Sequence, residues 1–331
     1  MIRPARLSLV AGLFMAVLVL AFGAVMIGPL NLTPFQVLAA LVGRGGDQAE
    51  TVIWSIRLPR VAAAVLLGAA LAAAGASYQA LFRNPLVSPD ILGVSAGAGL
   101  GAVAGIFLSL PVAAIQLSAF AGGMAAVGVV TLISTLVRNT DRTLTLVLIG
   151  VVIGALAGAA TSLLKVLADP YDQLPAITFW LLGSLASITT EDIRPALPAV
   201  AVGLVPLVLL RWRINVLSLG DDEARALGVE AGRTRLLVIA AATLVTASVT
   251  ALAGVVGWVG LVIPHIARML VGPGFGQLLP VSLLIGAAYL LIVDTLARTI
   301  AQVEVPLGIL TAVIGAPFFV WLLARGRRGW T

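Results

Sequence analysis

Ten apolar stretches, each about as long as a membrane is thick, divide the chain almost from end to end. A helix needs about 20 apolar residues to cross a hydrocarbon core about 30 Å thick, and helices satisfy their own backbone hydrogen bonds in lipid. The expected spans are 7–28, 61–81, 91–110, 112–137, 144–167, 193–210, 236–256, 257–271, 278–297 and 306–324. This pattern predicts an all-α membrane protein with a single transmembrane domain over 1–331.

The composition agrees with a membrane location and excludes a soluble globular domain. Hydrophobic residues make up 60% of the 331 residues and charged residues only 10%, whereas soluble domains carry about 25% charged residues. The first apolar stretch is longer than the core of a signal peptide and has no convincing cleavage site after it, so we expect a retained first span. The stretch 174–187 is too short to cross, and we expect it to lie at the surface or to re-enter the bundle.

Basic residues are distributed unevenly between alternate connections of the expected spans. Fourteen of the 20 lysine and arginine residues fall on the side that holds both termini. The other six are Arg44, Arg57, Arg60, Lys165, Arg194 and Arg298. Because basic residues collect on the cytoplasmic side of membrane proteins, both termini and the loop 211–235 are predicted to be cytoplasmic. The net charge of +6 follows from this bias, and no nucleic-acid partner is expected.

The residue types that common catalytic and cofactor sites need are scarce. The chain has no cysteine, which excludes disulfides and thiolate metal sites. Its one lysine, Lys165, stands in the sequence LLKV, so the chain cannot supply a P-loop lysine. Its one histidine, His265, is a poor metal site because even a catalytic zinc takes about three protein ligands. We predict a chain that is not an enzyme, with no catalytic residue, no metal and no bound cofactor.

Small residues recur at every fourth position in three of the expected spans. They are Gly93, Gly97, Gly101 and Gly105 in the third, Gly150, Gly154 and Gly158 in the fifth, and Gly68, Ala72 and Ala76 in the second. Such spacing lets helix backbones approach closely, in a solvent that provides little hydrophobic drive between helices. The pattern fits ordinary tight packing, and it also fits a helix that must slide or tilt against its neighbours.

A polar segment broken by prolines separates the second and third spans. It reads FRNPLVSP over 82–89. Pro85 and Pro89 stop helices, and Asn84 and Ser88 can bond the backbone groups that the prolines leave free. On the inferred orientation this segment lies on the cytoplasmic side.

Five stretches of the chain carry a family resemblance. They are RLPR at 57–60, YQALFRNPLVSPDILGVSAGAG at 78–99, LSLGDDEARALGV at 217–229, GVVGWVGLVIPHIAR at 254–268 and EVPLGILTAVIGAPFFVWLL at 304–323. These stretches resemble the permease subunits of ABC importers for iron-siderophores, heme and vitamin B12. Together they reach from residue 57 to the C-terminus, in the order and spacing of the family. The resemblance implies the ten-helix fold of the vitamin B12 importer permease, which agrees with the number of expected spans.

The resemblance also implies partners, a location and a function. It implies a homodimer, or a heterodimer with a close paralogue, in the bacterial inner membrane. Two ATPase subunits would bind ATP and Mg on the cytoplasmic side, and a periplasmic substrate-binding protein would load the channel from outside. The expected function is the import of an iron-siderophore, heme or a corrinoid, driven by ATP hydrolysis on a separate chain.

A coupling surface for the ATPase is expected in the loop 211–235. The sequence GDDEARALG predicts a short helix over 221–227 with acidic residues in its first turn, where the helix dipole favours them, and with Gly228 at its C-terminal cap. By pattern alone this is a solvated amphipathic helix, whereas in the resembling permeases such a helix fits a cleft of the ATPase subunit. The implied contact residues are Leu219, Glu223, Ala224, Ala226, Leu227 and Gly228, together with His265, whose alternative role is purely structural.

The resemblance implies two further sets of residues. A cytoplasmic gate is implied at the loop between spans two and three and at the turn between spans four and five, with the residues Asn84, Leu86, Thr143 and Leu144. Docking to glutamates of the binding protein is implied for the arginines Arg57, Arg60 and Arg298. A guanidinium group suits bidentate pairing with a carboxylate, although arginines at span ends also anchor proteins at the membrane interface.

An ion-coupled secondary transporter is the main alternative, and a membrane receptor or scaffold is the third. A secondary transporter usually keeps ionisable residues deep in its bundle. Here Lys165, Asp294 and Glu304 fall near the outer ends of spans, and His265 falls towards the inner side. The nearly uncharged middle of the bundle therefore disfavours proton or sodium coupling.

Overall fold

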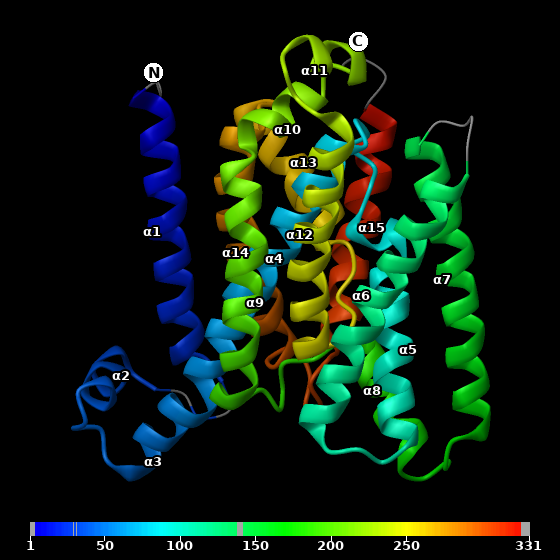
Figure 1. The fold of residues 1–331 in the computed structure, drawn as a ribbon. Coiled ribbons are helices and arrows are strands. Elements are labelled where there is room, and N and C mark those ends of the chain that lie inside the picture. The colour runs from blue at the N-terminus through cyan, green and yellow to red at the C-terminus, as the bar shows by residue number, and fades with distance from the viewer. Residues whose placement is uncertain (1–3, 29, 31, 138–141, 326–331) are drawn as a thin grey trace.

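The computed structural model describes residues 4–28, 30, 32–137 and 142–325 (Figure 1), and no strand occurs among them. The helices of the first half are α1 (Pro4–Met26), α2 (Pro34–Leu41), α3 (Asp47–Thr51), the π-helix η1 (Val52–Arg57), α4 (Leu58–Leu81), the 3₁₀ turn η2 (Pro89–Leu92), α5 (Val94–Phe107), α6 (Val112–Leu136) and α7 (Arg142–Leu167). The helices of the second half are α8 (Gln173–Leu182), α9 (Thr190–Leu209), α10 (Arg211–Leu217), α11 (Asp221–Ala226), α12 (Ala231–Ala253), α13 (Val259–Val271), α14 (Phe275–Ala297) and α15 (Leu307–Arg325).

The helices form one bundle in which α4 and α12 are innermost. In the most apolar 18-residue stretch of α12, and of the continuous helix that ends with α4, 78% is buried. The corresponding share is 17% in α1 and 22% in α7. Figure 1 shows α1 and α7 at opposite edges of the bundle, with α4 and α12 between them. The edge helices expose large apolar side chains such as Phe14, Leu18, Leu156 and Leu163. A surface of this kind suits contact with lipid and not with water.

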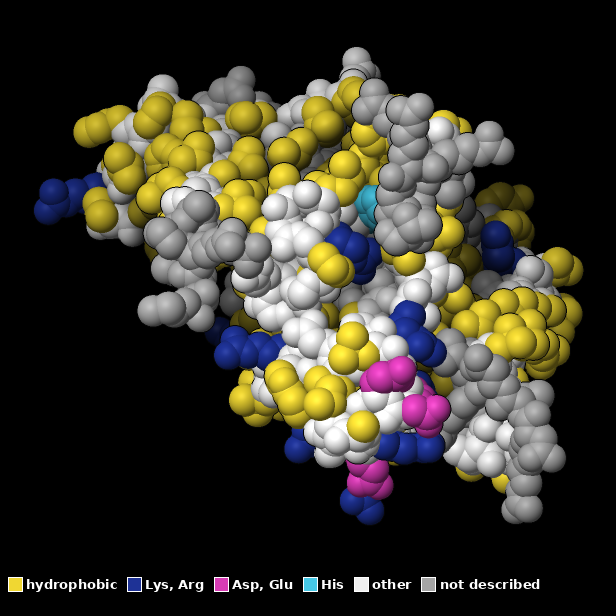
Figure 2. Space-filling view, turned by 90° about the horizontal axis from the view of Figure 1, so that it is seen from above, with side chains coloured by type: hydrophobic (Ala, Val, Ile, Leu, Met, Phe, Trp, Pro, Cys, Tyr) yellow, Lys and Arg dark blue, Asp and Glu magenta, His cyan; other side chains and the backbone are white. Residues whose placement is uncertain are grey.

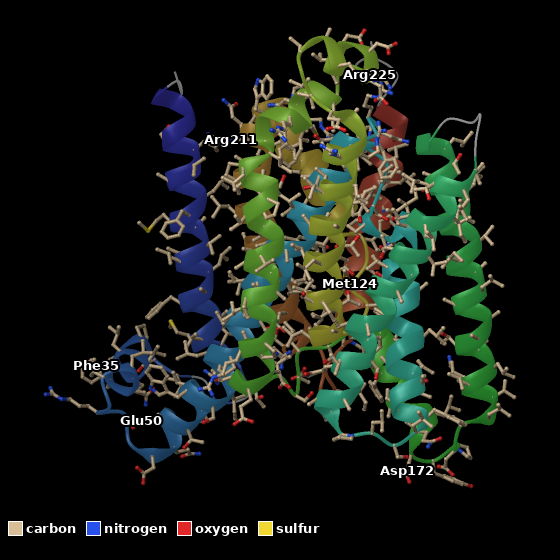
Figure 3. The ribbon with its side chains drawn as sticks, viewed as in Figure 1. Phe35, Glu50, Met124, Asp172, Arg211 and Arg225 are labelled. Atoms are coloured by element: carbon tan, nitrogen blue, oxygen red, sulfur yellow. The ribbon has the colours of Figure 1, made fainter. Side chains whose placement is uncertain are left out.

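The two ends of the bundle differ in what they carry. The terminal face is the end at which α1 begins and α15 ends, and it also carries α10 and α11, whereas α2 and α3 lie at the opposite face (Figure 1). Figure 3 shows Arg211 and Arg225 at the terminal face, Glu50 and Asp172 at the opposite face, and Met124 between them. Charged groups therefore gather at the ends of the bundle, as expected for helices that cross a membrane.

Each expected span falls on one helix, although the lengths differ. Among the described residues, seven helices are long and apolar enough to cross a membrane, while α5, α13 and α15 are shorter apolar helices. The helix α12 begins at Ala231, earlier than the expected start at 236. Helix α8 covers part of the stretch 174–187 and packs on the bundle through one side, where Ile177 is fully buried, while Phe179 is 58% exposed. Both expected placements of that stretch, at the surface or re-entrant, stay predictions.

The segment between α4 and α5 contains no α-helix, and its 3₁₀ turn η2 packs against other helices of the bundle. Pro89 packs so closely on α13 that a Cβ atom at Gly260 would stand 2.6 Å from its Cδ atom. A Cβ atom at Gly150 of α7 would likewise overlap the carbonyl oxygen of Ile91. Helix α5 therefore begins at Val94 rather than near 91, and its 14 residues span only about 21 Å. The end of the polar segment and the turn after it therefore pack against α13 and α7 before α5 begins.

Glycines bring several helix pairs into backbone contact. A Cβ atom added at Gly97 would overlap the carbonyl oxygen of Gly122, and one at Gly68 would overlap that of Gly286. The closest approach of this kind joins Gly75 to the carbonyl oxygen of Gly260. It was not predicted, because Gly75 does not belong to the small-residue face expected for this span. The predicted small-residue faces thus pack closely on α4 and α5. On α7 the predicted face packs closely at Gly150, whereas no atom of another described segment lies within 4 Å of a Cβ atom added at Gly158.

Substituting Gly75 by alanine should lower the melting temperature of the purified protein. The added methyl group would meet the backbone of α13, which cannot move aside as a side chain can, and overpacking of this kind destabilises by about 1–3 kcal/mol. The matched control is Gly128→Ala in α6, where no atom lies within 4 Å and alanine favours a helix over glycine. Thermal unfolding in detergent measures both, and equal melting temperatures would contradict the packing argument.

Candidate functional site

A cavity of about 680 Å³ opens at the terminal face between the ends of α4, α10, α13 and α15. Its lining residues are Gln79, Ala80, Arg83, Asn84, Pro85, Ile214, Asn215, Ser218, His265, Arg268, Met269, Pro273, Trp321 and Leu322. The terminal-face cavity therefore joins the start of the polar segment to the helix that leads into α11. Figure 2 shows this face of the molecule, with the histidine side chain drawn in cyan beside basic side chains.

A buried glutamine fixes the wall between α4 and α13. Pro264 stands inside α13 and has no N–H group for the carbonyl of Gly260 one turn earlier. The side-chain amide of Gln79 lies beside this position and donates to the carbonyl of Leu261 at 3.1 Å. This contact holds the two helices together next to His265, which is half-buried in the cavity wall.

The first turn of the polar segment follows directly from its sequence. Helix α4 ends in a capped turn in which the N–H groups of Arg83 and Asn84 donate to the carbonyls of Ala80 and Gln79. Arg83 takes the left-handed conformation, with φ of +50°, in the position where glycine is usual. The Asn84 side chain then accepts from the N–H of Leu86 at 2.9 Å, as the sequence predicted. This turn places Asn84 in the cavity wall and leaves Leu86 39% exposed.

The short helix α11 is built as its sequence predicts. Asp221, Asp222 and Glu223 occupy its first turn. At its end Gly228 has φ of +76°, and the N–H groups of Gly228 and Val229 donate to earlier carbonyls of the helix, which is a Schellman cap. An ion pair of 2.9 Å between Arg235 and Asp221 ties α11 to the start of α12. The helix is therefore held in one place on the terminal face.

Apolar side chains of α11 and its flanks point away from the chain. Leu219 is 60% and Leu227 is 53% exposed, and Glu223 is also exposed. These residues lie beyond the span ends, among charged groups, so contact with lipid does not account for their exposure. Such apolar side chains within a polar rim are typical of a protein–protein interface.

At the opposite face, buried arginines hold several segments of the chain together. Arg60 forms a bidentate pair with Glu304, with nitrogen–oxygen distances of 2.7 and 2.9 Å. Its Nε atom lies 2.9 Å from the carboxylate of Asp294, which is 1% exposed. Arg298 lies 3.8 Å from the other oxygen of Asp294. We name these residues, together with Arg57, the arginine cluster.

The cluster also caps the end of α1. Arg57 donates to the carbonyls of Val25 and Met26 at 2.6 and 3.0 Å, and Arg298 donates to the carbonyl of Ala24 at 2.6 Å. The last carbonyls of a helix have no donor within the helix, and cations at this end also offset its dipole. The arginine cluster therefore joins α1, α4, α14 and the segment that contains Glu304.

The sequence of the chain matches that of a known transport family over nearly its whole length. The match to the FecCD transport family covers residues 15–325. The chain belongs to the FecCD transport family.

Several known proteins are similar to the chain over most of its length. The cobalamin import system permease of Halobacterium salinarum is 45% identical over 84% of this chain and 74% of its own. The Fe(3+)-citrate import system permease YfmE of Bacillus subtilis is 41% identical over 97% of this chain and 96% of its own. A solved structure described as an inward-facing conformation of a metal-chelate type ABC transporter has a TM-score of 0.88 and 37% identity, over 96% of this chain and 99% of its own.

The coupling residues that the family resemblance implied do not all lie at the surface. Leu219, Glu223, Ala226, Leu227 and Gly228 are exposed. Ala224, in contrast, is fully buried beneath α11, so it supports the helix and cannot itself contact a partner. This is a correction to the expected contact residues.

Three of the four gate residues that the resemblance implied are described by the structure, and these three lie at the terminal face. Asn84 and Leu86 lie in the turn after α4, and Leu144, which is 55% exposed, lies in the first turn of α7. The side chain of Thr143 lies outside the described residues. Of these residues only Asn84 is among those that line the terminal-face cavity, where it joins His265.

The arginines expected to dock a binding protein do not present their guanidinium groups at the surface. Arg57 and Arg60 are 4% and 6% exposed, and the Arg298 side chain is 6% exposed. Their partners lie within the chain, so the geometry argues against direct pairing with another protein, and docking stays a prediction. One signal was available in the sequence, because Asp294 lies inside an expected span and Arg60 directly precedes another, and ionisable residues inside membranes usually pair with one another.

Proposed function

We propose that this chain is the membrane-spanning, non-catalytic subunit of a bacterial ABC importer, with ATP and Mg bound by a separate ATPase subunit. Membership of the FecCD transport family supports this proposal. The observation that carries it is the surface of α11, which offers Leu219, Leu227 and Glu223 to a protein partner at the terminal face. A chain that lacks a P-loop lysine needs such a partner if ATP drives transport.

We assign the terminal face to the cytoplasm and the protein to the inner membrane. The excess of basic residues on the side that holds both termini supports this orientation. The complex would contain two copies of this chain, or one with a close paralogue, two ATPase subunits, and a substrate-binding protein at the opposite face.

Docking of the binding protein is proposed to depend on the charge of the arginine cluster. The cluster has three guanidinium groups for the two carboxylates of Asp294 and Glu304. The surplus positive charge would attract acidic side chains of the binding protein. The association of the two proteins should therefore weaken as the salt concentration rises.

The proposed cargo is an iron chelate, heme or a corrinoid. The support is the naming of similar proteins as permeases for cobalamin and Fe(3+)-citrate and as a metal-chelate transporter. Uptake by vesicles that contain this chain, its ATPase and its binding protein tests both the mechanism and the cargo. Labelled iron-siderophore, ferric citrate, heme and cobalamin should enter only with ATP, and one of them should enter fastest. Uptake driven by a proton or sodium gradient alone would instead favour the secondary transporter.

The gate is proposed at Asn84, Leu86, Thr143 and Leu144, where two copies of each would approach the axis of a symmetric dimer. The exposed positions of Asn84 and Leu144 support this assignment. In the same vesicles, Asn84→Cys should cross-link to its symmetry mate and stop uptake, because the native chain has no cysteine. Cross-linked vesicles that still transport would exclude this position as a gate.

A further inference from the structure

The terminal-face cavity carries positive charge that the described chain does not balance. Arg83 and Arg268 both line it, and none of the described acidic residues does. Among the described residues neither guanidinium group has a hydrogen-bond or ion-pair partner, and the Nη1 atom of Arg268 is shielded from solvent. Each arginine of the cluster at the opposite face, in contrast, bonds to at least one carbonyl or carboxylate, although the Nε atom of Arg298 is also buried without a hydrogen-bond acceptor in the described part of the chain. A shielded guanidinium nitrogen without an acceptor destabilises a protein, so an acceptor from outside the described chain is expected at Arg268.

A second residue of the cavity wall, Gln79, has a buried acceptor atom that lacks a donor within the described chain. The Oε1 atom of Gln79 is buried without a donor among the described residues, although its amide nitrogen donates to Leu261. Because that bond fixes the orientation of the amide, rotating the group cannot supply the missing donor. The cavity therefore combines cations that need an acceptor with an acceptor that needs a donor. An occupant that carries both an anion and a hydroxyl group satisfies both.

The size and the apolar lining of the cavity point to an amphiphile. A volume of about 680 Å³ lies within the range of ligand sites, about 300–1,000 Å³. Besides its polar groups the cavity is lined by apolar side chains that include Ile214, Met269, Trp321 and Leu322. Met269 is 64% and Trp321 is 43% exposed, so apolar groups reach the outside. The cavity lies near the ends of α4, α13 and α15, at the level where lipid headgroups meet water.

We propose that the terminal-face cavity binds the headgroup of an anionic phospholipid whose glycerol group carries free hydroxyls, as phosphatidylglycerol does. The phosphate accepts from Arg268 and Arg83, since guanidinium groups bind phosphate in a fixed geometry. A headgroup hydroxyl donates to Gln79, and the first acyl carbons contact Met269 and Trp321. Basic pockets between membrane helices are suited to anionic headgroups.

An acidic side chain of a protein partner fits the cavity less well. A carboxylate accepts from arginine but, when ionised, cannot donate to the oxygen of Gln79. One side chain would also leave most of the volume of about 680 Å³ unfilled. A carboxylate would also make no use of the apolar side chains that line the cavity. The lipid accounts for the charge, the missing donor and the apolar lining together.

Native mass spectrometry of the full-length purified chain tests this proposal. The delipidated protein is titrated with phosphatidylglycerol or with phosphatidylcholine that has the same acyl chains. We expect phosphatidylglycerol to bind about tenfold more tightly, and Arg268→Gln to reduce this preference about fivefold, the effect of one basic residue near an anionic headgroup. Arg268→Lys should restore part of the preference, and Arg83→Gln should weaken it independently if Arg268→Gln fails to fold.

The matched control is Arg233→Gln, which removes an exposed arginine from the same face outside the cavity, and should leave the preference unchanged. Equal binding of the two lipids, or an unchanged preference in Arg268→Gln and Arg83→Gln, would overturn the proposal. Displacement of the lipid by an equal concentration of soluble glycerol phosphate would assign the cavity to a free phosphate ester instead. Loss of ATPase association in Arg268→Gln with unchanged lipid binding would assign it to the protein partner.

Discussion

Replacing Arg60 by methionine is expected to prevent most of the protein from folding stably. Asp294, which is 1% exposed, would lose its closest cation, and Glu304 would lose both of its hydrogen bonds to Arg60. Removing one partner of a buried ion pair typically destabilises a protein by about 3–5 kcal/mol, a large part of a total stability of about 5–15 kcal/mol. The melting temperature and the yield of monodisperse protein in detergent should both fall.

Two further variants separate this effect from a general loss of positive charge. Arg44→Met removes an exposed arginine from the same face and should leave the melting temperature nearly unchanged. Adding Asp294→Asn to Arg60→Met removes the buried charge that was left without its partner, and should recover part of the lost stability. If Arg60→Met melted at the same temperature as Arg44→Met, the arginine cluster would not stabilise the fold.

The sequence predicts the positions of the long apolar helices well, because lipid demands helices of this length and composition. It does not predict where chain at membrane depth is non-helical. Helix α5 begins only at Val94 because Pro89 and the carbonyl of Ile91 pack against Gly260 and Gly150. Those glycines belong to helices far along the chain, so no local pattern around residue 91 records the contact. For the same reason the sequence did not predict the closest backbone approach, in which Gly75 meets Gly260 of the distant helix α13.

In the candidate site, too, the features that depend on neighbouring residues could be predicted, and those that depend on distant residues could not. The caps of α11 and the turn at Asn84 are local hydrogen-bond patterns, and both follow from the sequence. The burial of Ala224 depends on how α11 packs against its neighbours, and the ion pair between Asp221 and Arg235 helps to set that packing. The pairing of Arg60 with a carboxylate of α14 joins residues 234 positions apart. Neither could be derived from composition or spacing alone.

The double substitution Glu223→Lys with Leu227→Asp should abolish association with the ATPase subunit while the permease remains folded. Both side chains are exposed on and beside α11, and Glu223 forms no ion pair among the described residues, so the change removes little that the chain uses internally. An exposed leucine that fits a partner's cleft contributes about 2 kcal/mol or more when it is a hot spot, and a reversed charge adds repulsion. Affinity should fall about a hundredfold or more, and ATP-dependent uptake should stop.

The control for this prediction makes the same kinds of change at the opposite face. Glu191→Lys with Val303→Asp replaces an exposed acid and an exposed apolar residue and should leave ATPase association intact. Co-purification with the ATPase measures association, and thermal unfolding of each permease alone confirms that both variants fold. Because Ala224 and the Asp221–Arg235 pair hold α11 from beneath, the helix can keep its position while its outer surface changes. If the α11 variant still co-purified and still hydrolysed ATP in response to cargo, motion of the ATPase would reach the gate through another part of the terminal face.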